Sequence, residues 1–316
     1  EIAARVLRFS GMLPLIASWR RRSRETLTVL AYHRVTEHPS VGPSTTDDEL
    51  ISASPDQFRR QMQFVRDNFS PITFAQFRAF QEQGLELPPA PLIVTFDDGF
   101  ADNYLFAYPI LRELRLPATI FIVTENVDTG RPFWFEHLAR AILTTGLLET
   151  LPPESILRVG VRPEDKKAAA ARILSHLKRV SESERRNFLG GILRDADDGC
   201  PVDCRPLTWA QIREMADHGI EFGSHTVSHP ILSRVDDAQL SEELCMSKAR
   251  IECMTGKKVV ALAYPVGGAE SVTERVREMA RIAGYRYACM YEPGVNALSD
   301  TDWHAIRRVR VERYVS

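Results

Sequence analysis

Short apolar runs recur along the chain at lengths typical of buried β-strands. They cover residues 27–32, 92–96, 118–123, 220–224 and 259–264. Continuous apolar runs of four to eight residues are typical of strands that are covered on both faces. We therefore expect a sheet that lies inside the protein.

Amphipathic helical patterns separate these runs. Apolar residues recur at helical spacing at Phe58, Met62, Val65 and Phe69, and again at Leu240, Leu244, Ile251 and Met254. Thr208 with Gln211, and Ser271 with Glu274, have the spacing of capping boxes, which start helices, and Gly284 is expected to end the second of these helices. Strands that alternate with helices imply βα units and a mainly parallel sheet.

The alternation breaks between Phe133 and Pro206. Residues 164–180 and 181–196 have helical composition, rich in Ala, Arg, Lys and Glu, and this stretch contains no convincing strand. We interpret about 135–206 as a helical insertion in one α/β barrel that extends over 27–316. The sequence leaves open whether the insertion caps a substrate cleft or forms an outer layer.

The composition of the 316 residues is that of an ordinary globular protein. Hydrophobic residues make up 44% and charged residues 26%, which excludes disordered, collagen-like and coiled-coil classes. The net charge of −2 shows no basic excess, so we expect no nucleic-acid partner. Five cysteines without a recurrent spacing argue against a disulfide scaffold and favour a reducing compartment.

Residues 1–26 form a basic, amphipathic segment. Leu15, Ile16 and Trp19 precede the arginine-rich stretch 20–24, a combination that suits peripheral contact with a membrane surface. A terminal helix packed on the domain is the alternative. Because the chain begins at Glu1 without Met, a removed upstream signal segment stays open. We expect a cytoplasmic protein, with membrane association as the open alternative.

Two strand ends carry candidate chemistry. The run 92–96 leads directly into Asp97 and Asp98, and two adjacent carboxylates at the end of a buried strand are costly unless a cation compensates them. The run 220–224 leads into His225 and His229, whose spacing allows both imidazoles to face one side of a helical turn and bind one metal ion. Asp98 or Asp97 would complete a three-ligand site with open positions, as in catalytic metal centres.

The two motifs together resemble those of the polysaccharide deacetylases, the NodB-homology or carbohydrate esterase family 4 enzymes. The matching stretches are Thr95-Phe96-Asp97-Asp98-Gly99 and His225-Thr226-Val227-Ser228-His229. The resemblance implies a distorted (β/α)7 barrel and the hydrolysis of an N-acetyl, or alternatively N-formyl, group on an amino sugar of a polysaccharide, oligosaccharide or lipid-linked glycan. It also implies one divalent metal ion, expected to be Zn²⁺ with Co²⁺, Ni²⁺ or Mn²⁺ as alternatives.

The resemblance also implies a role for each matching residue. Asp97 corresponds to the general base, and Asp98, His225 and His229 correspond to the metal ligands. A carboxylate that is not consumed in ligation can take a proton from water, which agrees with this division.

The chain departs from the family pattern in two places. The third family motif, Arg-x-Pro-Tyr, corresponds here to Ala263-Tyr264-Pro265-Val266, so the arginine that steadies the catalytic aspartate is missing from this position. The backbone amide of Val266 remains available to the oxyanion. The C-terminal Leu-x-His motif, which supplies the acid, is also absent. The Tyr-His motif at His33 resembles the branch of poly-N-acetylglucosamine deacetylases, in which this histidine is the acid; His304 is the alternative.

Pro265, Tyr264 and Trp134 are the expected substrate-binding residues, although an aromatic run at a helix start is as often part of a core. Two other functions compete with deacetylation. A catalytically weak glycan-binding protein would explain the altered third motif. A metal phosphoesterase also uses Asp and His ligands, but its two-metal forms need a second ligand set that the sequence does not offer.

Overall fold

Seven parallel strands form a closed barrel at the centre of the molecule. The computed structural model describes residues 24–37, 50–144, 165–177, 180, 182–192 and 202–311. In their order around the barrel the strands are β1 (Thr26–Tyr32), β5 (Pro91–Phe96), β6 (Thr119–Ile122), β7 (Glu221–Ser224), β8 (Ala261–Ala263), β9 (Tyr287–Pro293) and β11 (Ile306–Arg310). Strand β1 pairs with both β5 and β11, which closes the ring. The expected (β/α)7 barrel is confirmed.

Four shorter strands lie beside the barrel strands or form a separate pair. Strand β4 (Ser70–Pro71) lies beside β5, and β10 (Asn296–Ala297) pairs with β1 in the antiparallel direction. Strands β2 (Arg34–Val35) and β3 (Ile51–Ala53) form a separate parallel pair. The pair follows β1 directly and therefore lies at the carboxyl end of that barrel strand.

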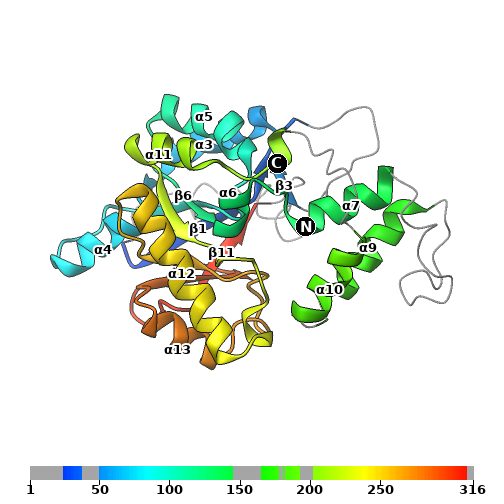
Figure 1. Cartoon of the computed structure of the whole chain (residues 1–316). Helices are drawn as coiled ribbons and strands as arrows, with labels where there is room; N and C mark the ends of the chain where they lie inside the picture. Colours follow the sequence, from blue (N-terminus) through cyan, green and yellow to red (C-terminus); the bar gives the residue numbers. More distant parts are fainter. Residues whose placement is uncertain are drawn as a thin grey trace, which may run out of the picture.

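Helices surround the strands (Figure 1). They are α3 (Pro55–Asn68), α4 (Phe74–Glu82), α5 (Tyr108–Leu114), α6 (Thr124–Thr129), α11 (Trp209–Asp217), α12 (Asp237–Thr255) and α13 (Glu274–Ile282). The shorter turns are a π-helical turn at Asn103–Ala107 and 3-10 turns at Val202–Cys204 and Leu232–Arg234. The capping box at Thr208 and Gln211 is confirmed. The one expected at Ser271 is wrong, because Thr273 accepts the capping bond from the amide of Val276.

Alternate residues of the strands face the barrel axis. Residues such as Val29 of β1, Ile93 of β5 and Phe121 of β6 form the inner apolar cluster. Their neighbours in sequence, such as Val94 and Ile120, pack outward among the helices. This period of two is the side-chain direction that a strand imposes. The same alternation determines which side chains just beyond the strand ends point toward the barrel axis.

The sequence pattern did not predict β9 and β11. Strand β11 reads Ile-Arg-Arg-Val-Arg, and the inward position after Ile306 is Arg308, which is fully buried. A search for apolar runs misses a strand whose barrel-facing side chain is charged. A charge inside the barrel needs a buried partner of opposite sign, and this partner lies at the barrel mouth.

The helices of the insertion form their own apolar cluster against the barrel. They are α7 (Trp134–Thr144), α9 (Lys166–Leu177) and α10 (Glu182–Ile192), and they lie to one side of the barrel in Figure 1. Their buried residues pack with Phe100 and Val123, which follow β5 and β6. The insertion therefore contacts the carboxyl end of the barrel. Residues 1–23 of the expected N-terminal segment lie outside the described residues. Among the helices that are described, none is long and apolar enough to cross a membrane.

Candidate metal centre and catalytic site

The expected site residues meet at the carboxyl end of the barrel. His33 follows β1, Asp97 and Asp98 follow β5, and His225 and His229 follow β7. In open and closed parallel sheets alike, this end of the strands carries the functional groups. His33, Asp97 and His225 each continue the inward-facing alternation of their strand, so the backbone itself turns them toward the axis.

Asp98, His225 and His229 form a compact group of possible metal ligands, which we call the triad. Asp98 Oδ1 lies 3.4 Å from Nε2 of each histidine, and the two Nε2 atoms lie 3.2 Å apart. Ligands about 2.1 Å from a tetrahedral zinc ion are separated by about 3.4 Å. Two imidazole nitrogens and one carboxylate oxygen at these separations therefore fit a single divalent ion. In the described part of the chain, this is the one group of three or more such residues.

Hydrogen bonds outside the triad orient its histidines. His225 Nδ1 donates a hydrogen bond to the carbonyl of Ala263 at 2.7 Å, which leaves the Nε2 lone pair facing Asp98 and His229. Thr226 Oγ1 accepts a hydrogen bond from the amide of His229 at 3.0 Å. The expectation that both histidines lie on a helical turn is wrong, because residues 225–229 form a loop and His229 has φ of 59°.

A glutamate from α12 supports this loop. Glu243 is 4% exposed, and its carboxylate accepts the amides of Val227 and Ser228 at 2.7 and 2.9 Å and the hydroxyl of Ser228 at 2.6 Å. The sequence gave no signal for Glu243. Its bonds cross between elements that are distant in sequence.

We expect Glu243→Gln to weaken metal binding by about 10–100-fold. The glutamine side chain has an NH2 group in place of one carboxylate oxygen, and this group cannot accept the hydrogen bonds that the loop donates. The segment that carries His229 would then shift. Titration with zinc measures the affinity. Glu252→Gln on the same helix is the matched control, because Glu252 contacts Lys248 and the amide of Val259 instead of the loop. Equal affinities in the two variants would show that Glu243 does not hold the ligands in place.

Strained backbone is concentrated around the triad. The described residues other than glycine with positive φ include Asp98 (70°), Thr226 (71°), His229 (59°) and Val266 (65°). Such conformations cost of order 1–3 kcal/mol each and persist where the surrounding structure holds them. Gly99 follows with φ of 78°, and a Cβ there would lie 2.6 Å from Ile122 Cγ2, so glycine is required after the aspartate pair.

Asp97 pairs with an arginine that the sequence analysis did not find. Arg308 Nη1 and Nη2 each lie 2.7 Å from a different carboxylate oxygen of Asp97, and both side chains are buried. Arg308 also donates to the carbonyl of Met290 at 2.8 Å. The conclusion that the aspartate lacks its arginine is therefore corrected. The arginine comes from β11 rather than from the stretch at Ala263.

This pairing decides the charge of Asp97. Burial raises the pKa of the Asp97 carboxyl, but the charge of Arg308 and its hydrogen bonds outweigh burial, so the pKa lies below its ordinary value. A bidentate guanidinium also fixes the plane of the carboxylate. Asp97 is consequently an ionised, oriented acceptor beside the triad.

Residues 85–288 match the profile of a family described as Polysaccharide deacetylase, and this span covers more than half of the chain. The chain belongs to the polysaccharide deacetylase family. The Bacillus subtilis protein YxkH, whose name places it among polysaccharide deacetylases, is 23% identical over 286 residues, 90% of this chain and 71% of the relative.

Other relatives match the chain over shorter regions. The poly-β-1,6-N-acetyl-D-glucosamine N-deacetylase of Escherichia coli K12 is 32% identical over 91 residues, 28% of this chain and 14% of the relative. The enzyme of that name from Staphylococcus aureus strain MSSA476 is 30% identical over 105 residues, 31% of this chain and 36% of the relative. These alignments therefore span much less than two thirds of both relatives.

Solved structures share the fold of this chain. The Streptococcus pyogenes deacetylase PplD in complex with acetate superposes with a TM-score of 0.62 at 18% identity, covering 92% of this chain and 94% of that one. IcaB from Ammonifex degensii superposes with a TM-score of 0.58 at 19% identity, covering 91% and 92%. The predicted membership of this family, near the poly-N-acetylglucosamine deacetylases, is confirmed.

His33 lies beside the aspartate in this family member. Its Nε2 is 3.9 Å from Asp97 Oδ2, and its ring meets the edge of Tyr291 at 5.3 Å between centroids. The candidate acid and the candidate base are therefore neighbours. His33 directly follows β1, and this position brings it to the barrel mouth.

The residues of the third motif divide between two faces. Val266 is 47% exposed after Pro265, on a turn in which the amide of Gly267 donates to the carbonyl of Pro265. Tyr264 continues the outward alternation of β8, is 1% exposed, and donates its hydroxyl to the carbonyl of His304 at 3.0 Å. The expected contact of Tyr264 with substrate is therefore wrong in this arrangement, since the strand period directs its ring into the outer core.

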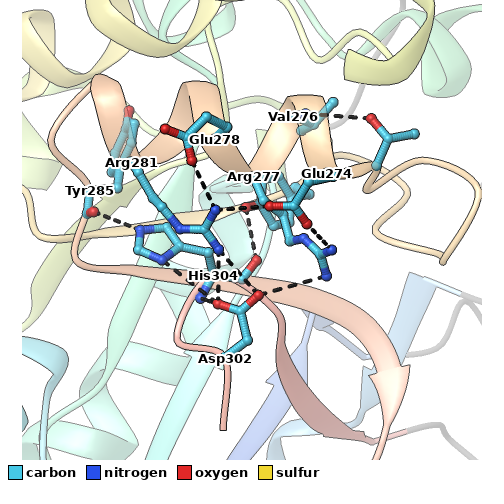
Figure 2. A network of polar contacts seen from close by, with 10 residues as sticks. Glu274, Val276, Arg277, Glu278, Arg281, Tyr285, Asp302 and His304 are labelled. Atoms are coloured by element: carbon cyan, nitrogen blue, oxygen red, sulfur yellow. Dashed lines mark hydrogen bonds and ion pairs between the residues drawn. The ribbon is translucent and has the colours of Figure 1, made fainter.

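His304 is held in a separate network between α13 and β11 (Figure 2). Its Nε2 lies 2.9 Å from the carbonyl of Tyr285, and its amide donates to Asp302, which in turn pairs with Arg281. His304 precedes β11, whereas the ligands follow their strands. It therefore lies toward the opposite end of the barrel from the triad, and the structure does not bring it to the site.

The insertion reaches the triad through α7 and α10. The ring of Phe135 lies 6.0 Å from that of His229, and Arg185 stacks over Trp134 at 4.7 Å. Burial lowers the pKa of His229, and the positive charge of Arg185 acts in the same direction. The insertion thus covers part of the candidate metal site, and Trp134 belongs to that cover.

Proposed function

We propose that the chain hydrolyses the N-acetyl group of an amino sugar in a glycan, with one divalent ion, Zn²⁺ first among the candidates, held by Asp98, His225 and His229. The observation that carries the proposal is the three-ligand group with the ionised carboxylate of Asp97 beside it in one barrel mouth. An ion bound there would polarise the amide carbonyl and lower the pKa of a nearby water molecule.

Different residues at the barrel mouth accept a proton, stabilise the oxyanion and donate a proton. Asp97, which Arg308 holds ionised, accepts a proton from water as the water oxygen adds to the carbonyl carbon. The backbone amide of Val266 donates to the oxyanion that forms. His33 then donates a proton to the nitrogen as the carbon–nitrogen bond breaks, so that the products are acetate and a free amine.

The relatives support the substrate class. Two of them are named for poly-β-1,6-N-acetyl-D-glucosamine, and a fold neighbour is a deacetylase that holds acetate. We therefore place N-acetylglucosamine polymers first among the substrates and N-formyl sugars second. Arg308 removes the reason for favouring a weak glycan-binding protein, because the aspartate does have its arginine.

The direct test is incubation of zinc-loaded protein with N-acetylated and N-formylated oligosaccharides, including β-1,6-linked N-acetylglucosamine oligomers. We expect acetate release from the acetylated glycan, measured by an enzyme-coupled assay, and a new free amine on the sugar. Protein treated with a chelator is the control. Absence of acetate and formate release from every glycan, with zinc bound stoichiometrically, would contradict the proposal.

We expect His33→Ala to lower kcat by about 100-fold with little change in KM, because an amine leaves poorly unless it is protonated. Zinc content should stay at the level of the unchanged protein, since His33 is not in the ligand group. Steady-state kinetics with metal analysis measures both. His304→Ala is the matched control and should keep its rate; a severe loss there with a normal rate in His33→Ala would transfer the role.

A further inference from the structure

Two polar residues just beyond the aspartate pair are completely buried. Asp102 and Asn103 are both 0% exposed, and a buried polar group is costly unless it is hydrogen-bonded. Asn103 begins the π-helical turn Asn103–Ala107, a distortion that is frequent at functional sites. Their hydrogen bonds include those to His33, to Arg34 and to each other, so both residues are linked to the segment that follows β1.

The amide of Asn103 holds the backbone of His33. Its Nδ2 donates to the carbonyl of His33 at 2.9 Å and to Asp102 Oδ1 at 2.8 Å, which uses both of its hydrogens. On the other side, the amide of His33 donates to Ser52 Oγ at 2.9 Å. The main chain of His33 is thus fixed from both sides, and the direction of its imidazole toward Asp97 depends on it.

The acceptor half of the same side chain has no hydrogen-bond partner among the described residues. Asn103 Oδ1 is buried and unpaired. An unpaired buried acceptor costs free energy that an apolar residue would not incur. The two hydrogen bonds donated by Asn103 Nδ2 therefore account for an amide at this position. One goes to the carbonyl of His33 and the other to Asp102.

A buried ion pair fixes the orientation of that amide. Arg34 Nε donates to Asp102 Oδ2 at 2.6 Å, and its guanidinium lies 4.9 Å from the centroid of Phe100. Arg34 Nη1 also lies 3.7 Å from Glu136 Oε1 on α7, which ties the insertion to the same group. Buried pairs add little stability but impose geometry. Asp102 consequently presents Oδ1 to Asn103 in one fixed position.

We propose that Asn103, oriented by the Asp102–Arg34 pair, is a positioning residue that holds His33 for proton donation. The inference rests on the proposed function, in which His33 is the acid. Asn103 acts through the His33 main chain and does not contact the reacting atoms.

The test is a double-mutant cycle between Asn103→Ala and His33→Ala. We expect Asn103→Ala to lower kcat about tenfold at unchanged KM and zinc content, since small misplacements of a catalytic group are costly. In the His33→Ala background it should cause no further loss, because its effect passes through the imidazole. Asn126→Ala is the matched control; Asn126 Nδ2 donates to the carbonyl of Arg131 and should leave kcat unchanged in both backgrounds.

A second readout does not depend on turnover. The imidazole signals of His33 in a proton–carbon NMR spectrum, assigned by their absence in His33→Ala, should shift in Asn103→Ala and not in Asn126→Ala. Should Asn103→Ala fail to fold, Asn103→Ser replaces it in the cycle, because the shorter hydroxyl does not reach the His33 carbonyl.

The outcomes separate the two proposals. A normal rate in His33→Ala would overturn the acid role of His33 and with it the proposed mechanism. A severe loss in His33→Ala, combined with unchanged His33 signals in Asn103→Ala or with losses that multiply in the double variant, would overturn the positioning role of Asn103 alone.

Discussion

Asp97→Asn will keep its zinc and lose two to four powers of ten in kcat, the range by which a general base contributes. Asparagine has nearly the shape of aspartate, but its amide cannot take a proton from water at neutral pH. The ligand group of Asp98, His225 and His229 is intact in this variant, so metal content should stay stoichiometric. Turnover of an N-acetylated oligosaccharide and metal analysis of the same sample measure the two quantities.

Asp98→Asn is the informative comparison, because the neighbouring carboxylate belongs to the ligand group. It should lose affinity for zinc together with activity. If Asp97→Asn lost zinc to the same degree, Asp97 would be a ligand and the base would have to be sought elsewhere. Asp97→Asn also changes the surroundings of Arg308. Its guanidinium then faces a neutral side chain and loses one of the two hydrogen bonds that it donates to Asp97.

The sequence was sufficient for the parts of the site that are local in the chain. Asp97 and Asp98 directly follow one apolar run, and His225 and His229 follow another, so strand ends and residue types together indicated a metal centre. Parallel strands place their carboxyl ends at one edge, and this brought the two motifs together without knowledge of the fold. His33 was identified by the resemblance of its Tyr-His motif to one branch of the family, and its position just after β1 brings it to the same edge.

The parts that the sequence missed depend on distant segments. Arg308 lies 211 positions from Asp97, and its strand looks basic rather than apolar because the charge faces the barrel axis. Glu243 reaches the histidine loop from the middle of α12. Hydrophobic periodicity does not indicate contacts between residues that are so far apart in the sequence. An arginine at an inward position of a short terminal strand is a signal that becomes readable only once the barrel is assumed.

Side-chain direction also separated residues of a single motif. Tyr264 continues the outward direction of β8 and is buried in the outer core, whereas Val266 lies on the turn after Pro265, with φ of 65°, and is exposed at the mouth. A match to a motif therefore did not assign a role to each of its members. The strand period accounts for the direction of Tyr264, and the turn beyond the strand accounts for that of Val266.

His225→Ala will lose zinc and activity together. His225 would supply one of the three ligand atoms, and no other His, Cys, Asp or Glu in the described ranges joins the group to replace it. We expect the affinity for zinc to fall by more than about 100-fold, a larger loss than the removal of a group that only orients a ligand would cause. Because the metal binds the folded state, zinc should raise the Tm of the unchanged protein and not that of the variant.

The matched control is His218→Ala. His218 lies at the end of α11, where its Nδ1 contacts the carbonyl of Glu214, and it belongs to no ligand group. It should keep its zinc affinity, its zinc-dependent rise in Tm and its turnover. Equal zinc affinity in His225→Ala and His218→Ala would exclude His225 as a ligand. Loss of zinc from His225→Ala with full retention of turnover would instead separate the metal from the reaction, because the carboxylate of Asp97 and the imidazole of His33 would then suffice.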